Sequence, residues 1–569
     1  MNCRWQLASA DSLLTDPIRR ELSVDPLLAQ CLVNRGYSDS EAAGTFLEPR
    51  LKNLADPFLL PNMEAAVERL LVAREQEELV VIFGDYDVDG VTSTTLLLDV
   101  LGGMGWRVEP YLPHRVDEGY GLSRDGLENC LSKHAAGLLL AVDCGSTAVD
   151  SIAWLAEQGI DTIVLDHHQV SDPAPNARAL VNPQLGERFQ ELCSVGLAFK
   201  LAHALVKRGR ESSLSAAADF DVRNLLDLVA LGTIADLVPL RDENRILVCA
   251  GLPRLSETVR PGLAALKAVA QCPAKIGSYE VGFQLGPRLN AAGRLETATE
   301  ALDLLLANDA GVARRLAEDL DGRNQERRSI ERGIVDHLIK DLKGRFDGTK
   351  DFAIIAGEQQ WHIGVVGIVA SRVSKEFYRP TFVIGGEGGE WRGSGRSIEG
   401  FDLAAALREC DDLLLRHGGH AMAAGVSIDP ERIPDFRRRM NEIARRELAD
   451  EALIPPLRLD AEVDLAMVSM DALSALERLQ PFGQGNPSVQ IVVRNLVLDG
   501  RPRTIGKDGN HLLLRVESRG QTADAVWWNG ADKPLPRSRF DLACVPEINE
   551  FRGRRSIRLK VLDWRDASG

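Results

Sequence analysis

The chain has 569 residues, of which 45% are apolar and 26% are charged, and its formal net charge is −16. This length exceeds what one hydrophobic core usually holds, and the composition excludes an intrinsically disordered chain, so we expect about three folded domains. No stretch approaches the roughly 18 successive apolar residues of a membrane span, and the N-terminus lacks a secretory signal pattern. The nine cysteines are scattered without a C-x-x-C pair, which disfavours thiolate zinc and favours a reducing, cytoplasmic setting.

The first 75 residues look helical and connective, and an apolar run at 80–83 then predicts a strand buried on both faces of a parallel sheet. Three carboxylates, Asp85, Asp87 and Asp89, follow it at alternate positions. Ligands in such sheets bind beyond the carboxyl ends of the strands, so these acids are placed where a site would be. They repel one another unless a cation or shared protons neutralise them, and hard divalent ions take such oxygen ligands. An isolated pattern of this kind is equally consistent with a solvated acidic turn.

The same arrangement recurs twice along the chain. A β-like run within 137–147 ends in Asp143, another within 160–170 ends in Asp166, His167 and His168, and helical segments separate the strands. Alternating strands and helices predict a parallel, doubly wound sheet over 76–240. A mostly apolar, helical segment at 225–240 contributes Asp236.

Each of these polar residues has a structural explanation when it is taken alone. The histidine pair is typical of capped or satisfied polar groups, Asp143 of a helix N-cap, and Asp236 of a cap or an ion pair. Taken together, they supply more ligands than one octahedral ion uses, and the sheet gathers them at one edge. The pattern therefore favours a metal site built from Asp85, Asp87, Asp89, Asp143, His167, His168 and Asp236.

The rest of the chain predicts three further regions. Residues 241–348 read as a helical connector with a long helix or helical pair over 298–343, and residues 349–450 as a smaller α/β domain with three glycine-rich stretches. After a proline-marked linker, residues 456–569 show the short alternating runs of a small all-β barrel or sandwich. Residues 488–569 carry 15 Lys and Arg against 10 Asp and Glu, a net of +5. These basic residues are equally consistent with a solvated face and with a nucleic-acid contact.

The motifs also carry a family resemblance. DYDVDG, VDCGS, LDHHQ and GTIADLVPL resemble, in order, the four motifs of the DHH phosphoesterase superfamily. WHIGVVGIVASR, GSGRS and HGGHAMAAG resemble the DHHA1 domain, and PFGQGNP before a β-rich tail resembles the layout of the RecJ family. The resemblance covers roughly residues 30–569. It implies an α/β fold with a parallel doubly wound DHH domain, a helical connector, a smaller α/β DHHA1 domain and a C-terminal all-β, OB-type barrel.

The resemblance implies a metal-dependent exonuclease that hydrolyses single-stranded DNA from the 5′ end to nucleoside 5′-monophosphates, in DNA repair and recombination. Two Mn²⁺ or Mg²⁺ ions would activate water and clamp the phosphoryl oxygens. The direct metal ligands it implies are Asp87, Asp89, Asp143, His167 and Asp236. Asp85 and His168 would be nearby ligands, partners of ligands or phosphate contacts, so the catalytic set includes His168, and Asp166 would hold the adjacent imidazole or backbone.

The substrate contacts implied by the resemblance lie mainly in the second α/β domain. Ser394, Arg396 and Ser397 would hold a terminal 5′-phosphate or the next backbone phosphate, and His420 would face the metals. Further candidates, each equally consistent with an inter-lobe salt bridge, are Arg115, Arg288 and Arg294.

Two alternatives to the exonuclease stay open. One is a DHH phosphoesterase acting on oligoribonucleotides, cyclic dinucleotides or pyrophosphate, against which the basic C-terminal domain speaks. The other is a non-catalytic binder of single strands, against which the intact acid set speaks. The partners expected with the exonuclease are single-stranded DNA, a single-stranded-DNA-binding protein and a helicase, with no membrane.

Overall fold

The computed structural model describes residues 3–114, 118–119, 121–295, 298–386, 389–551 and 553–567. The chain divides into two compact units. The larger unit combines Leu7–Asp321 with Leu459–Gly569, and the smaller one combines Met1–Gln6 with Gly322–Arg458. Among the helices that the structure describes, none is both long enough and apolar enough to cross a membrane.

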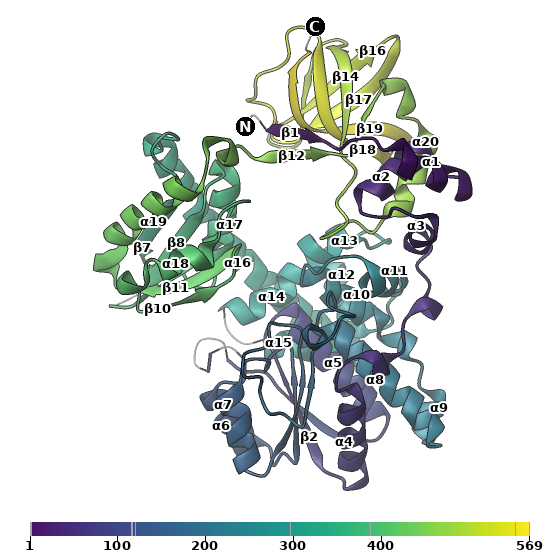
Figure 1. Ribbon diagram of the computed structural model, residues 1–569, viewed down its shortest axis with the longest axis vertical. Coiled ribbons are helices and arrows are strands. Elements are labelled where there is room, and N and C mark those ends of the chain that lie inside the picture. The colour runs from purple at the N-terminus through teal and green to yellow at the C-terminus, as the bar shows by residue number, and fades with distance from the viewer. Residues whose placement is uncertain are drawn as a thin grey trace. The chain divides into compact units, whose positions relative to one another are not determined.

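A five-stranded parallel sheet in the order β3-β2-β4-β5-β6 organises the larger unit (Figure 1). Successive residues of β2 enter different cores, with Val80 and Ile82 on one face and Val81 and Phe83 on the other. This burial on both faces confirms the strand and the doubly wound sheet that the apolar run predicts. The strands are β2 (Leu79–Gly84), β3 (Arg107–Tyr111), β4 (Leu138–Val142), β5 (Asp161–Leu165) and β6 (Ala179–Val181).

Helices cover both faces of this sheet. One core contains residues of α4 (Met63–Glu75), α5 (Val88–Gly103), α8 (Ser194–Glu211) and α10 (Leu226–Ala235). The other contains residues of α6 (Arg124–Lys133) and α7 (Val149–Glu157). Both faces of the sheet are therefore packed against helices.

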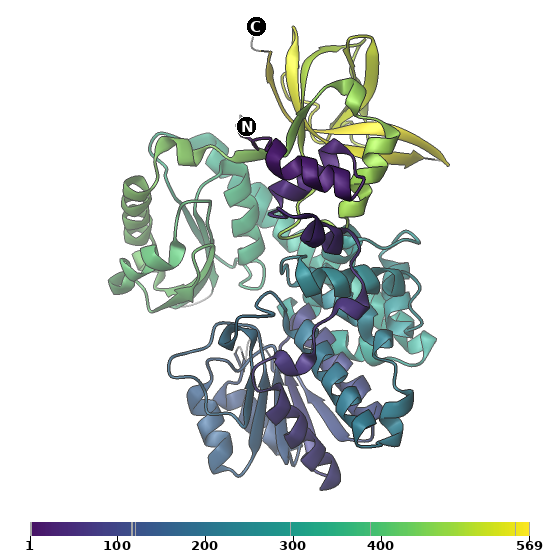
Figure 2. The same cartoon turned by 45° about the vertical axis from the view of Figure 1, so that its right-hand side comes forward.

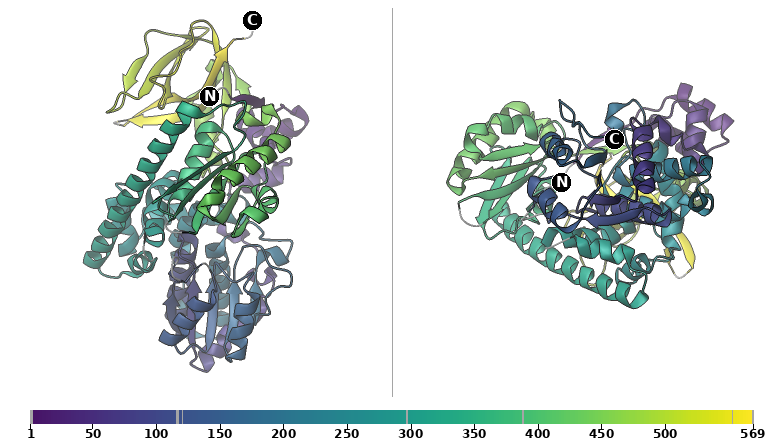
Figure 3. Two further views of the ribbon diagram at one scale, coloured as in Figure 1. Left: turned by 90° about the vertical axis from the view of Figure 1, so that its left-hand side faces the viewer. Right: turned by 90° about the horizontal axis from the view of Figure 1, so that it is seen from below.

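The expected helical connector follows the sheet as a series of helices. Its first members are α11 (Asp242–Ser256), α12 (Pro261–Val269), α13 (Ser278–Glu280), a π-helical turn (Val281–Leu285) and α14 (Gly286–Leu295). The predicted long helix or helical pair over 298–343 is a pair, α15 (Thr299–Leu306) and α16 (Ala310–Arg345), and Figure 3 shows α16 as one continuous helix.

The C-terminal part of the larger unit is a closed β-barrel. Its sheet runs β13-β14-β18-β19-β17-β16-β15, and an additional pairing of β14 with β16 closes a ring of five strands. This is the OB-type barrel expected from the short alternating runs. Its strands are β13 (Ala461–Val463), β14 (Ile491–Leu498), β15 (Arg503–Ile505), β16 (His511–Ser518), β17 (Gln521–Trp527), β18 (Phe540–Phe551) and β19 (Arg554–Asp566).

The N-terminal helices belong to the core of this barrel, which the sequence did not reveal. Figure 2 shows the N-terminal helices beside the C-terminal strands, and Leu28 and Leu32 of α2 (Pro26–Asn34) and Phe46 of α3 (Ser40–Leu47) belong to one apolar cluster with barrel residues. The side chain of Arg35 donates to Asn486 Oδ1 at 2.8 Å. Buried Arg245 of α11 donates to the carbonyl oxygens of Phe46 and of residues 478–480, which ties the DHH core to the same region.

The smaller unit contains a mixed five-stranded sheet in the order β10-β11-β9-β8-β7. One face packs against α16 and α17 (Val366–Phe377), and the other against α18 (Leu403–Arg408) and α19 (Ile433–Glu447). Its strands are β7 (Ile354–Gln359), β8 (Thr381–Gly386), β9 (Trp391–Arg396), β10 (Arg416–Gly419) and β11 (Ala423–Ile428).

One strand was not expected in the helical N-terminal segment. β1 (Arg4–Leu7) pairs with β12 (Pro456–Leu459) in a two-stranded sheet. The partner lies more than 400 residues away, as the bond from Arg4 N to Pro455 O shows, and no local pattern encodes such a pairing.

Candidate metal centre

Asp85, Asp87 and Asp89 lie where β2 ends and α5 begins. Asp87 caps the helix, and its Oδ1 accepts from Gly90 N at 3.1 Å. A Cβ atom on residue 90 would lie 2.4 Å from the carbonyl oxygen of Asp85, so only glycine permits this tight turn. Asp85 and Asp89 are buried, at 3% and 1% exposure. The local sequence thus folds three carboxylates into one turn and removes two of them from bulk water.

Asp89 is fixed by the start of α8. Its two carboxylate oxygens accept from the backbone N–H groups of Ser194 and Val195 at 2.7 and 2.8 Å. The N-terminus of a helix carries partial positive charge, so this contact stabilises the ionised acid. Ser194 also donates its hydroxyl to Asp143 Oδ1 at 2.9 Å. One helix start therefore positions acids from two different strands.

Asp143, His167 and Asp236 converge from three segments of the chain. Asp143 follows β4 in the left-handed region, with φ +63°, and Asp236 lies at the C-terminal end of α10. His167 Nε2 lies 3.6 Å from Asp143 Oδ1 and 3.6 Å from Asp236 Oδ2. These separations exceed hydrogen-bond length, so the three groups surround a common space without bonding one another.

Asp166 holds the histidine pair in place, as expected. Its Oδ1 accepts from the backbone N–H groups of His167 and His168, and from His168 Nδ1 at 2.8 Å. Burial alone would raise the pKa of Asp166, but the bond from His168 lowers it to about 2. Burial alone would lower the pKa of His168, but the same bond raises it to about 9. The pair therefore behaves as a carboxylate bound to an imidazolium.

The remaining groups show the opposite electrostatics. Burial, followed by repulsion from Asp87, raises the pKa of Asp89 to about 7. Burial and neighbouring acids, chiefly Asp89, raise the pKa of Asp236 to about 9, and the same two causes raise that of Asp143. Burial and the adjacent imidazolium lower the pKa of His167 to about 4, which leaves the neutral ring that metals bind.

These residues fit a pair of divalent ions. Three overlapping groups each place their ligand atoms within 4.8 Å of one another: Asp85, Asp87 and Asp143; Asp89, His167 and Asp236; Asp143, His167 and His168. Within the described ranges, His167 Nε2 and Asp236 Oδ2 are buried without a hydrogen-bond partner. Two ligands about 2.1 Å from one ion are separated by about 3–4 Å, which matches their 3.6 Å spacing. A cation would satisfy these atoms and remove the repulsion between the acids.

Of the residues expected to contact phosphate in the smaller unit, Ser394 and Arg396 lie together, and Ser397 and His420 have other surroundings. Arg396 Nη1 donates to Ser394 Oγ at 2.9 Å, and both lie beside Gly367 in the first turn of α17. Among the described residues Arg396 has no salt bridge, and burial lowers its pKa. Ser397 instead donates its hydroxyl to the Phe401 carbonyl oxygen, and His420 is exposed.

Of the three other arginine candidates, only Arg288 can be placed by its contacts. Arg288 is engaged by Asp321 at 2.8 Å and by the Gln284 carbonyl oxygen. Arg115 and the side chain of Arg294 lie outside the described residues.

Sequence reasoning missed two residues that organise the site. The role of Ser194 could not be predicted from the sequence, because it depends on where the start of α8 lies in the folded protein. Buried Asn182, which follows β6, donates to Ser146 Oγ and to the carbonyl oxygen of His168, both at 2.8 Å. The only local signal at Asn182 is the Asn-Pro turn pattern at the end of a short strand.

Comparisons with known proteins match this architecture domain by domain. The model of the DHH family, N-terminal domain, matches residues 79–233, the DHHA1 domain matches 349–446, and the RecJ OB domain matches 459–563. The single-stranded-DNA-specific exonuclease RecJ of Bacillus subtilis is 37% identical over 98% of this chain and 70% of that protein. The protein of the same name from Haemophilus influenzae is 37% identical over 96% of this chain and 97% of its own length. The chain belongs to the RecJ family.

Solved RecJ structures agree with the fold and with metal binding. The structure of RecJ in complex with Mn²⁺ from Thermus thermophilus is 30% identical and covers 100% of this chain and 80% of that chain, with a TM-score of 0.85. The Mg²⁺ complex from the same organism has a TM-score of 0.79 at 28% identity. Divalent ions thus occur in RecJ structures of the same fold.

Proposed function

We propose that the chain is a divalent-metal-dependent exonuclease that degrades single-stranded DNA from the 5′ end to nucleoside 5′-monophosphates. The observation that carries this proposal is a pair of adjacent ligand groups, Asp85 with Asp87 and Asp143, and Asp89 with His167 and Asp236, in which Asp143 Oδ1 and His167 Nε2 lie 3.6 Å apart. Two adjacent ligand groups are what two adjacent ions require. The names of the RecJ relatives support the single-stranded DNA substrate.

The ligand roles follow from burial and charge. We assign Asp87, Asp89, Asp143, His167 and Asp236 as the residues that would hold the two ions. Asp85 completes the acidic group around Asp143. When bound, the two ions lower the pKa of a water molecule and neutralise the charge on the phosphoryl oxygens.

His168 is proposed as a hydrogen-bond donor to the substrate. Its Nδ1 bonds Asp166 Oδ1 at 2.8 Å, and that bond raises the pKa of the ring to about 9. An imidazolium carries a second N–H group at Nε2, and the His168 side chain is 45% exposed. We assign the Nε2–H group to a phosphate oxygen of the substrate, where it stabilises the charge that develops during hydrolysis.

Arg396 and Ser394 are proposed as an anchor for the 5′-phosphate. A half-buried guanidinium without a carboxylate partner is a stable arrangement only if an anion or water completes it. The first turn of α17 adds the positive end of a helix beside the same group. Ser397 and His420 remain proposed contacts of the same substrate.

The barrel is proposed as the track for the rest of the strand. Arg501, Arg503 and Lys507, around β15, form no salt bridge among the described residues, so their charges are available to phosphate. Trp527 is buried in the barrel core, whereas Trp528 is 42% exposed. Trp528 packs edge-on against His511 at 4.7 Å and offers its ring to a base.

The partners are inferred from the substrate, and the location from the cysteines. We propose that a single-stranded-DNA-binding protein and a helicase supply the strand, because a nuclease of this kind needs unpaired DNA. We also propose a cytoplasmic location, which the nine free cysteines support, since disulfides are rare in reducing compartments.

The decisive experiment follows the release of nucleotides. Purified protein is mixed with Mn²⁺ and with single-stranded, double-stranded and RNA oligonucleotides of one sequence, labelled at either end. We expect 5′-mononucleotides from the DNA single strand alone. Asp143→Asn and His167→Ala should reduce turnover below a few per cent of wild type while strand binding persists. The matched control is Asp150→Asn, an exposed acid at the start of α7.

Two results would contradict the proposal. Substantial activity of the Asp143 or His167 variant at saturating Mn²⁺ would refute the ligand assignment. Hydrolysis of cyclic dinucleotides or pyrophosphate in preference to DNA would favour the small-substrate phosphoesterase instead.

A further inference from the structure

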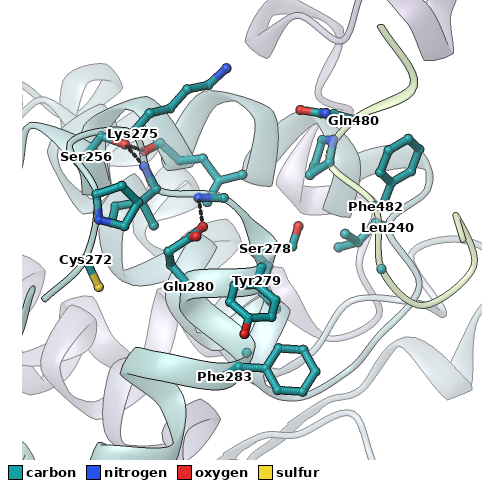
Figure 4. Close-up of a pocket in the computed structure, with 18 of the residues that line it drawn as sticks. Leu240, Ser256, Cys272, Lys275, Ser278, Tyr279, Glu280, Phe283, Gln480 and Phe482 are labelled. Carbon is teal, nitrogen blue, oxygen red and sulfur yellow. Dashed lines mark hydrogen bonds between the residues drawn. The ribbon is translucent and has the colours of Figure 1, made fainter. Parts of the chain in front are cut away.

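A large apolar pocket lies within the larger unit, and residues on both sides of the candidate ligand Asp236 in sequence, Ile234 and Leu237, line it. Its volume is about 1310 Å³, and its walls come from α10–α13, the π-helical turn and the 480–488 segment (Figure 4). Leu237, which lines it, directly follows the candidate ligand Asp236 and is 70% exposed. It also adopts φ +62°, a conformation that is uncommon for leucine. A large apolar side chain is thus held in water beside the reacting centre.

Two aromatic rings continue this exposed surface. Tyr279 and Phe283 are 62% and 72% exposed, and their rings stack with centroids 5.1 Å apart and planes 29° apart. Val281 and Leu285, between and after them, are fully buried and anchor the segment. Tyr279 thus stands on α13 and Phe283 on the π-helical turn that follows it, and such turns are frequent at functional sites.

The opposite wall leads to the barrel. Figure 4 shows Phe482 across the pocket from Tyr279 and Phe283. Its segment, which continues into β14, is docked on the loop after the metal ligand, because Leu240 N donates to Gln484 O at 2.8 Å. A strand that runs from the metal centre to the barrel would pass through this pocket.

From these features we infer that Tyr279 and Phe283 form a base-stacking platform for the single strand between the metal centre and the barrel, with Leu237 as a further apolar contact in the same pocket. This inference rests on the proposed function. The lining is mainly apolar, so the pocket suits base faces; of its two lysines, Lys267 donates to the carbonyl oxygens of Leu255 and Ser256, and Lys275 is exposed, where it can contact one phosphate of the same strand. Stacking on aromatic rings is tolerant of sequence, as an exonuclease requires.

Fluorescence of 2-aminopurine tests the platform directly. Full-length protein in EDTA is titrated into 5′-phosphorylated oligothymidylates that carry one 2-aminopurine at successive positions. We expect the protein to quench 2-aminopurine fluorescence at one or two adjacent positions near the 5′ end. The Phe283→Ala variant should lose this quenching, and the Tyr279→Phe variant should keep it. Affinity should fall about 10-fold for Phe283→Ala and also for Phe283→Leu, because an aliphatic side chain has no π face. Leu13→Ala, at a residue 83% exposed on α1 (Ser12–Glu21), is the matched control.

Turnover separates this inference from the proposed function. With Mn²⁺, the Phe283 and Tyr279 alanine variants should raise KM for a long oligonucleotide about 10-fold. They should hydrolyse 5′-phosphothymidine 3′-(p-nitrophenyl phosphate), which has no base 3′ of the scissile phosphate, to thymidine 5′-monophosphate and p-nitrophenyl phosphate at the wild-type rate. If wild type cleaves the oligonucleotide while every variant keeps wild-type quenching and affinity, the platform is refuted. The exposed side chains of Tyr279, Phe283 and Leu237 would then be a contact for protein. If wild type cleaves neither substrate, the proposed function itself fails.

Discussion

Replacing Ser194 with alanine tests how the start of α8 supports the metal centre. The substitution removes the hydroxyl that donates to Asp143 Oδ1 at 2.9 Å, and it leaves the backbone N–H groups that bind Asp89. A hydrogen bond to a charged group contributes about 1.5–3 kcal/mol. At about 1.4 kcal/mol for each factor of ten, the Mn²⁺ concentration for half-maximal activity should rise about 10- to 100-fold. Losses of this size are typical when a residue that orients a metal ligand is removed.

The assay is a Mn²⁺ titration of initial rates on one single-stranded oligonucleotide at saturating concentration. The maximal rate should return close to wild type at high Mn²⁺, because Asp143 itself is retained. Ser151→Ala, in α7 on the opposite face of the sheet, is the control, since its hydroxyl donates to the Leu122 carbonyl oxygen at 2.6 Å. An unchanged Mn²⁺ midpoint for Ser194→Ala, with Ser151→Ala also unchanged, would show that the hydroxyl does not position the ligand.

Three further outcomes follow from the same structure. Arg396→Ala should reduce kcat/KM about 10- to 100-fold for 5′-phosphorylated ends but little for 5′-hydroxyl ends, because a charge-assisted phosphate contact is lost; equal losses on both would exclude end recognition. The triple variant of Arg501, Arg503 and Lys507 to alanine should flatten the plot of log affinity against log salt by up to about 2, since each phosphate contact contributes about 0.7; an unchanged slope would exclude the barrel as a track. Chelation of metal should lower Tm more at pH 8 than at pH 6. Burial and repulsion from Asp87 raise the folded-state pKa of Asp89 to about 7, so the metal-free fold loses stability as pH rises toward that value. An equal drop in Tm at both pH values would contradict this.

The C-terminal track is tested by point variants because truncation would damage more than the track. Leu28, Leu32 and Phe46 of the N-terminal helices are buried in the barrel's core. Deleting the barrel would expose these residues, and a loss of activity would then report unfolding as much as lost DNA contacts. Point changes on the exposed face of the barrel avoid this problem.

The acidic turn and the fold class could be predicted because their signals are local. A buried strand ending in glycine and spaced acids defines the β2–α5 turn, and parallel strand pairing necessarily brings Asp143 and His167 to the same edge. The roles of Ser194 and Asn182 could not be predicted in this way. Each bonds groups from strands that are distant in sequence, and its importance depends on the exact place where one helix or strand ends.

Because α2 and α3 share a core with the C-terminal barrel, this core can form only late in synthesis. Arg35 and Asn486, which bond in the finished protein, are 451 residues apart. At about 5–20 residues per second, a ribosome needs roughly 20–90 s to bridge that interval. Throughout this time the apolar faces of α2 and α3 have no barrel to cover them, although the DHH core can already close. A chain that stops early therefore keeps an exposed apolar surface that chaperones and proteases recognise, so unfinished nuclease molecules are marked for removal.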